Sequence, residues 1–120
     1  MPKEIKLDYN IDKELFNTTA EDWAKVINGT KKTQVRGFYD KILDLEKQIK
    51  EDGFNDVYPF IKMLNSKVAY GVTRKVINDD FQKMMTQCLE QITADENGKE
   101  KFRVFKLFFE SVLGFYKEKK

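Results

Sequence analysis

Apolar residues recur along this chain at the spacing of an α-helix. The clearest stretch is residues 81–92, where they occupy positions i, i+3, i+4, i+7, i+8 and i+11: Phe81, Met84, Met85, Cys88, Leu89 and Ile92. A helix places these positions on one face, which can then be buried. No clear strand pattern competes with this periodicity, so the sequence predicts an all-α fold.

Capping residues and glycine-containing stops divide the rest of the chain into further helices. With the stretch above they predict a compact bundle of about five helices, the others covering residues 18–29, 33–52, 56–71 and 99–117. Gly71 and Thr73 predict a break after the third of the five. Trp23 is the expected core anchor of the first helix, and Cys88 is expected to be a core residue rather than a nucleophile.

The N-terminal segment, residues 1–17, has scattered apolar residues in partial alternation. This pattern fits either an extended or a disordered segment, and the choice stays open here. Residues 18–120 are interpreted as a single helical-bundle domain. A chain of 120 residues with 41% hydrophobic residues suits one globular domain with a real core.

The last predicted helix has an apolar surface that is too broad for one face. Its apolar residues are Phe102, Val104, Phe105, Leu107, Phe108, Phe109, Val112, Leu113, Phe115 and Tyr116. A helix of this kind is either central to its bundle or shared with a partner. Because a chain of 120 residues has limited capacity to surround it, we expect self-association or another partner surface there.

The composition excludes several classes of function. The chain has one cysteine, no histidine and no apolar run near 18 residues, so we expect a soluble, cytoplasmic protein without an internal disulfide or a membrane span. Without histidine or a carboxylate cluster, a metal site and acid–base catalysis lack their usual groups. The glycines are isolated, which excludes a phosphate-binding loop. We predict no catalytic residue, metal, cofactor or small-molecule substrate.

Positive charge is concentrated in the middle of the chain. The whole chain has a net charge of +2, whereas residues 31–75 hold 10 basic and 6 acidic residues, a net charge of +4. Charge alone makes candidates of Lys31, Lys32, Arg36, Lys41, Lys67, Arg74 and Lys75, and the nearby aromatic residues that could stack or pack are Tyr39 and Tyr70. Cations at the start of the helix over residues 33–52 make sense if a phosphate lies between them and the helix N–H groups. The alternative is a helical adaptor whose basic patch is incidental.

Three blocks of the sequence resemble the small subunit of type III-A CRISPR (Csm) effector complexes. They are Thr33-Gln34-Val35-Arg36 continuing into Phe38-Tyr39, Lys67-Val68-Ala69-Tyr70 with Arg74 four residues on, and the aromatic run from Phe108 to Lys117. Their order and spacing also fit, and the resemblance runs from about Thr19 to Lys117. Gly37 departs from the pattern, because the family more often has a basic residue there.

The resemblance implies an all-helical, non-catalytic protein that repeats as an inner filament along guide RNA and target RNA in antiviral defence. The implied partners are these RNAs, the backbone and large subunits of the complex, and other copies of the chain. The matching blocks make Gln34, Arg36, Lys67, Tyr70 and Arg74 RNA-contact candidates; Lys31, Lys32, Lys41 and Lys75 follow from charge alone. Arg36 can instead pair with Asp40, Tyr70 can instead belong to the core, and Gln34 can simply stabilise its own helix end.

Overall fold

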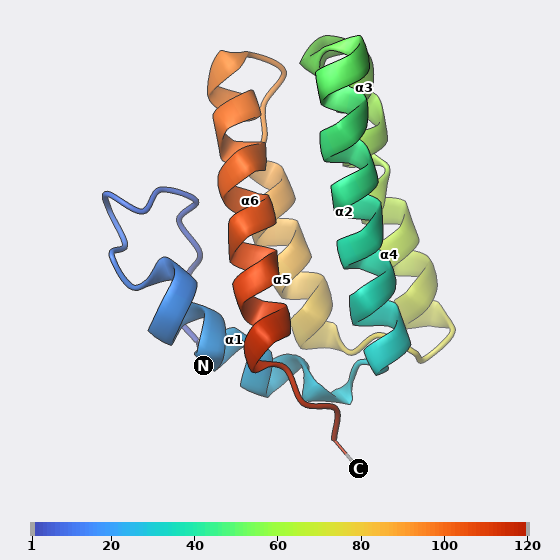
Figure 1. The fold of residues 1–120 in the computed structure, drawn as a ribbon. Coiled ribbons are helices and arrows are strands. Elements are labelled where there is room, and N and C mark those ends of the chain that lie inside the picture. Colours follow the sequence, from blue (N-terminus) through green and yellow to red (C-terminus); the bar gives the residue numbers. More distant parts are fainter. Residues whose placement is uncertain (1, 120) are drawn as a thin grey trace.

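Six α-helices make up most of the computed structural model, which describes residues 2–119 (Figure 1). They are α1 (Ala20–Val26), α2 (Lys32–Asp52), α3 (Phe54–Lys62), α4 (Leu64–Thr73), α5 (Asp79–Glu90) and α6 (Glu96–Phe115). A π-helical turn (Leu15–Thr19) precedes α1, and a 3₁₀ turn (Ile27–Gly29) follows it. The described residues contain no strand, so the predicted all-α helical bundle is confirmed.

The helices α2, α4, α5 and α6 stand side by side, and α1 lies across one end of them (Figure 1). The main contacts of α1 are with α6, α2 packs on both α3 and α6, and α4 packs on α5. No helix among the described residues is long and apolar enough to cross a membrane.

The broad apolar surface of α6 belongs to the core of the bundle. Phe105, Phe108 and Phe109 are fully buried, and the ring of Phe109 meets that of Phe81 edge-on at 6.2 Å between centroids. Because α6 packs between α1 and α2, both of its sides are covered. The width of this surface is therefore explained within the chain, and it does not support a partner surface along the whole helix. At its last residue a large ring, Phe115, is 38% exposed.

The helix predicted over residues 56–71 is in fact two helices, α3 and α4, which meet at Met63. Neither glycine nor proline marks this junction, and Pro59 lies inside α3, so the junction has no stop signal that could be read from the sequence. The turn at Met63 leaves Phe60 and Met63 exposed, although the periodicity placed Phe60 on the core side.

The break predicted around Gly71 and Thr73 is present, because α4 ends at Thr73. It ends in a Schellman motif, in which the Val76 N–H donates to the Gly71 carbonyl and the Lys75 N–H to the Val72 carbonyl, both at 3.0 Å. Gly71 lets Ile77 approach α4 closely: a Cβ at this position would lie 2.3 Å from Cδ1 of Ile77, so a larger residue would force that side chain to move.

Residues 2–14 are irregular, yet they pack closely on the bundle. Ile5 and Leu7 are 1% exposed. Their backbone groups bond to the side chain of Gln91, the residue that follows α5. Its Oε1 accepts from the Leu7 N–H (2.9 Å) and its Nε2 donates to the Ile5 carbonyl (2.7 Å). The side-chain amide thus gives the backbone N–H and carbonyl groups of this segment hydrogen-bond partners, as a neighbouring strand would.

A buried carboxylate holds the same N-terminal segment to the turn before α1. Asp12 accepts hydrogen bonds from the Thr19 hydroxyl (2.7 Å), the Glu14 N–H (3.0 Å) and the Lys3 ammonium (3.2 Å). Burial alone raises the pKa of Asp12, but these hydrogen bonds outweigh burial and hold its pKa below the ordinary value.

A small polar cluster, Thr30, Asn78 and Tyr116, joins the ends of several elements; we call it the Thr30–Asn78 cluster. Asn78 caps α5 by accepting from the Phe81 N–H (2.9 Å), and its amide donates to the Val26 carbonyl (3.0 Å). The buried Thr30 hydroxyl accepts from the Asn78 N–H (3.0 Å) and donates to Asn78 Oδ1 (3.1 Å). The Tyr116 hydroxyl donates to the Thr30 carbonyl, and burial raises the pKa of Tyr116 to about 12, so it stays a donor.

Replacing Asn78 with alanine is expected to destabilise the fold by about 2 kcal/mol, because a helix cap is lost and the partners of its side chain are left unsatisfied. Urea unfolding followed by circular dichroism measures this change. Asn65→Ala, at an exposed position of α4, is the matched control and should change the stability by less than about 0.5 kcal/mol. Equal stabilities of the two variants would contradict this role for the cluster.

Asp12 should make the stability depend on pH in the acid range. Because its pKa is lower in the folded than in the unfolded chain, its contribution is present above about pH 4 and is lost as the pH falls through the folded value. Asp12→Asn should therefore be less stable than the unsubstituted chain near neutral pH, with a gap that narrows on acidification. Chemical unfolding between about pH 7 and pH 3 measures the gap. The exposed Asp52→Asn variant should show no comparable gap, and a gap for Asp12→Asn that is independent of pH would refute this explanation.

Candidate nucleic-acid interface

A groove of about 310 Å³ lies between α2 and α4. Five of the nine RNA-contact candidates line it: Gln34 and Lys41 from α2, and Lys67, Tyr70 and Arg74 from α4 and its end. Thr33, Gly37 and Phe38 complete the lining. The residues of one wall are at least 26 positions from those of the other wall in the sequence, and the fold brings the two walls together. We call this feature the α2–α4 groove.

The lining of the α2–α4 groove has basic and neutral side chains and no acidic one. Lys41, Lys67 and Arg74 are exposed, and among the described residues none of them forms an ion pair within 4.0 Å. The guanidinium of Arg74 lies over the ring of Tyr70, 5.3 Å from its centroid. Tyr70 is 63% exposed, which excludes the alternative that it belongs to the core. The groove therefore presents positive charge and an accessible aromatic ring together.

The spacing of the α2 residues explains their shared face. Gln34, Gly37 and Lys41 are three and four positions apart, so they lie one above another on the helix. This spacing was visible in the sequence, but the opposite wall from α4 was not. A Cβ at Gly37 would meet nothing within 4 Å, so this glycine leaves the groove open at its middle.

A family model described as Csm2 Type III-A matches residues 10–120. The chain belongs to this family. It matches none of the curated proteins and none of the solved structures with which it was compared. Csm2 is the small subunit of the type III-A CRISPR (Csm) complex, so the resemblance seen in the sequence is confirmed, and this chain is a Csm small subunit.

The end of the first Csm2-like block and most of the third contribute to packing. Phe38 lies against Phe81, with ring centroids 5.5 Å apart. Tyr39 stacks on Phe109 at 6.3 Å and donates a hydrogen bond of 2.8 Å from its hydroxyl to Glu110 of α6. Burial and this hydrogen bond raise the pKa of Tyr39, which keeps it protonated. The aromatic C-terminal block is largely core, as described above.

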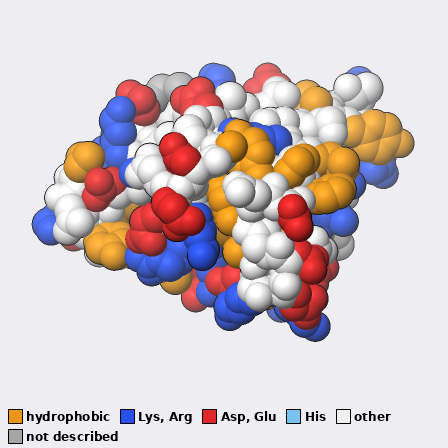
Figure 2. Space-filling view, turned by 90° about the horizontal axis from the view of Figure 1, so that it is seen from above, with side chains coloured by type: hydrophobic (Ala, Val, Ile, Leu, Met, Phe, Trp, Pro, Cys, Tyr) orange, Lys and Arg blue, Asp and Glu red, His pale blue; other side chains and the backbone are white. Residues whose placement is uncertain are grey.

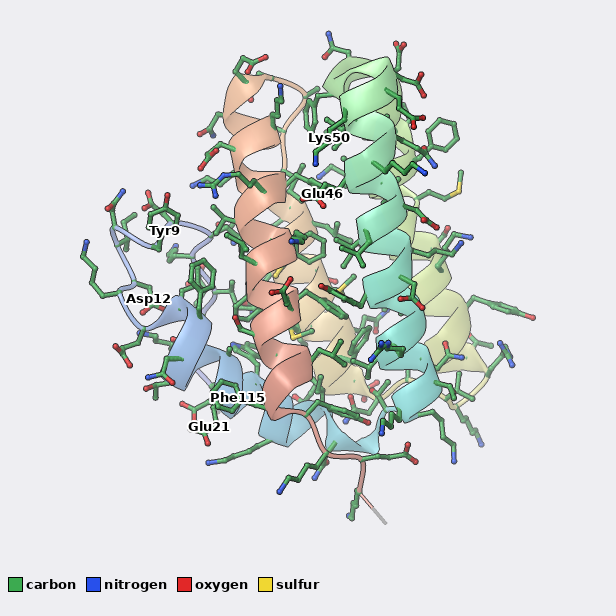
Figure 3. The ribbon with its side chains drawn as sticks, viewed as in Figure 1. Tyr9, Asp12, Glu21, Glu46, Lys50 and Phe115 are labelled. Carbon is green, nitrogen blue, oxygen red and sulfur yellow. The ribbon has the colours of Figure 1, made fainter. Side chains whose placement is uncertain are left out.

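The remaining α2 candidates lie outside the α2–α4 groove. Arg36 is one residue before Gly37 and so is turned about 100° from it around the helix, toward the α6 side of α2. Glu46 and Lys50 mark that side in Figure 3. The alternative pairing of Arg36 with Asp40 is absent from the described residues, since no such contact occurs within 4.0 Å.

The start of α2 already has an anion of its own. The Lys32 N–H donates a hydrogen bond of 2.7 Å to the Glu118 carboxylate, from the segment after α6. This carboxylate occupies the place that the sequence analysis assigned to a phosphate between the helix N–H groups and the cations. Lys31 donates its N–H to the Val76 carbonyl (3.0 Å), and the side chains of both lysines are exposed.

Lys75 occupies the left-handed position of the cap that ends α4, with φ 63°. Glycine is the usual residue there, because a Cβ is unfavourable at positive φ. Its backbone conformation is therefore set by the helix end, while its side chain remains exposed next to Arg74.

Lys75→Gly is expected to raise the free energy of unfolding by about 1 kcal/mol, because it removes the left-handed strain. Lys75→Ala removes the same charge but keeps the Cβ, so it should leave stability nearly unchanged. Comparing the two by urea unfolding separates the backbone effect from the charge effect. Equal stabilities would contradict the strain at this position.

Proposed function

We propose that this Csm small subunit binds RNA through the α2–α4 groove, as a non-catalytic subunit of an inner filament along guide RNA and target RNA. The observation that carries the proposal is the groove itself. Two sequence blocks that resemble the family's meet there, and the lining of the groove holds three basic side chains and no acidic one. In this proposal the complex acts in the cytoplasm in antiviral defence.

The chemistry of the groove favours contacts to phosphate and sugar. Lys41, Lys67 and Arg74 supply charge, and Gln34 supplies an amide that can donate to a phosphate oxygen. Such contacts are independent of base sequence, which a subunit repeated along a guide of any sequence requires. The ring of Tyr70 is available to stack on a base or ribose beside Arg74.

The proposal assigns the chain no chemical step. Csm2 small subunits are generally non-catalytic. Burial raises the pKa of the Cys88 thiol far above its usual range, so its thiolate is not available as a nucleophile. Incubation of the chain with RNA, with and without magnesium, should give no cleavage.

Partners would supply much of the affinity. The net charge of +2 favours only weak binding by a single copy, and repeated copies held by the backbone and large subunits would bind RNA through many weak contacts at once. Lys31, Lys32, Arg36 and Lys75 remain proposed contacts outside the groove, where they would face a different part of the RNA or a neighbouring subunit.

The triple variant Lys41→Ala, Lys67→Ala, Arg74→Ala tests the groove. Loss of three phosphate contacts should weaken binding of single-stranded RNA and should flatten the slope of log affinity against log salt by about 2 units, since each contact contributes about 0.7. Fluorescence anisotropy over a salt series, with the chain alone and in the Csm complex, measures both quantities.

The triple variant Lys25→Ala, Lys47→Ala, Lys83→Ala is the matched control, because it removes the same charge from exposed positions outside the groove. It should leave the slope within about half a unit of the unsubstituted value. If both variants lower the salt slope equally, RNA binding depends on net charge alone and not on the groove. If neither variant changes the affinity for RNA, the helical adaptor is favoured and the proposal is overturned.

A further inference from the structure

A second hollow, of about 340 Å³, continues the α2–α4 groove toward α3. Lys41 and Lys67 line both hollows, so the two are joined at these lysines. Along α2 the combined surface runs from Thr33 to Gln48, which is about 22 Å at the helical rise per residue. We call the second part the Phe60 hollow, after the aromatic residue that lines it.

The Phe60 hollow differs in chemistry from the groove that it continues. Phe60 is 52% exposed and Met63 46% exposed. Figure 2 looks down on this end of the molecule and shows exposed hydrophobic side chains, tyrosines included, on the side where α2, α3 and α4 lie in Figure 1. The buried Leu45 and Leu64 complete the apolar part of the lining. The surface is therefore an apolar site beside a basic one.

The polar residues of the Phe60 hollow are suited to a base and unsuited to a phosphate. Asp44 repels a phosphate, but its carboxylate accepts hydrogen bonds from the amino groups of bases. Gln48 has both a donor and an acceptor for a base edge. An exposed aromatic ring stacks on any base, because every base has a flat π-face.

We propose that the Phe60 hollow binds an unpaired nucleobase of the RNA whose phosphates lie in the α2–α4 groove. The inference rests on the proposed function, since Lys41 and Lys67 would hold the phosphates next to that base. It follows that the chain prefers single-stranded RNA to a fully paired duplex, in which every base is already stacked and the cost of unstacking must be met.

The test uses the full chain and a short single-stranded RNA that contains 2-aminopurine, a base whose fluorescence falls when it stacks. Phe60→Ala should lower the affinity for this RNA roughly ten-fold and abolish the fall in fluorescence, because the stacking surface is lost. The salt slope should stay unchanged, because no phosphate contact is removed. Phe60→Tyr keeps the ring and should restore both the affinity and the fluorescence signal.

Phe115→Ala is the matched control, since it removes another partly exposed phenylalanine, at the end of α6 and outside both hollows. It should leave RNA affinity and the fluorescence signal unchanged. The fully paired form of the same RNA should bind more weakly than the single strand, and Phe60→Ala should have little effect on its affinity.

The outcomes separate this inference from the proposed function. The triple variant of the groove can flatten the salt slope while Phe60→Ala changes neither affinity nor fluorescence. In that case the groove binds RNA, and the assignment of a base site to the Phe60 hollow is wrong. If Phe60→Ala instead leaves RNA binding intact but weakens assembly with other subunits, the hollow holds a protein side chain and the inference is also overturned. If the unsubstituted chain binds no RNA, alone or in the Csm complex, the proposed function fails and the inference with it.

Discussion

The paired hydrogen bonds between Thr30 and Asn78 set the geometry on which the candidate site depends. They join the loop before α2 to the start of α5, and Tyr116 closes the cluster from the segment after α6. Beside them, the Lys31 N–H donates to the Val76 carbonyl, so the start of α2 is bonded to the segment that follows α4. The two helices that form the groove are therefore held together at this end by backbone and buried polar groups.

The sides of helix α2 differ chemically, and each side packs against or forms a different part of the molecule. Its core side packs through Phe38 on Phe81, and Tyr39 links it to α6. Another side forms one wall of the α2–α4 groove and of the Phe60 hollow. Arg36 lies away from that wall, so the helix presents positive charge in two directions. In a filament subunit, such a division would let RNA and neighbouring chains meet different surfaces of one rigid element.

The helices were readable from the sequence because each local pattern agreed with the fold. The stripe from Phe81 to Ile92 is buried throughout, as is Trp23. The sequence failed where the deciding interaction comes from elsewhere in the chain. The side chain of Gln91 satisfies the backbone of the first residues, and the junction at Met63 has no local signal. Likewise, the broad apolar surface of α6 was explained by its place between other helices.

The sequence by itself determined the all-helical class, the core stripes, the excess of basic residues in the middle third and, through its blocks, the likeness to Csm small subunits. Tertiary structure alone decided which of those basic residues share a surface. Lys41 and Lys67 are 26 positions apart, yet they line the same two hollows, whereas Arg36 is five positions from Lys41 and lies elsewhere. The reason is that helical periodicity fixes the direction of a side chain on its own helix, while the partner of each face depends on how the helices pack.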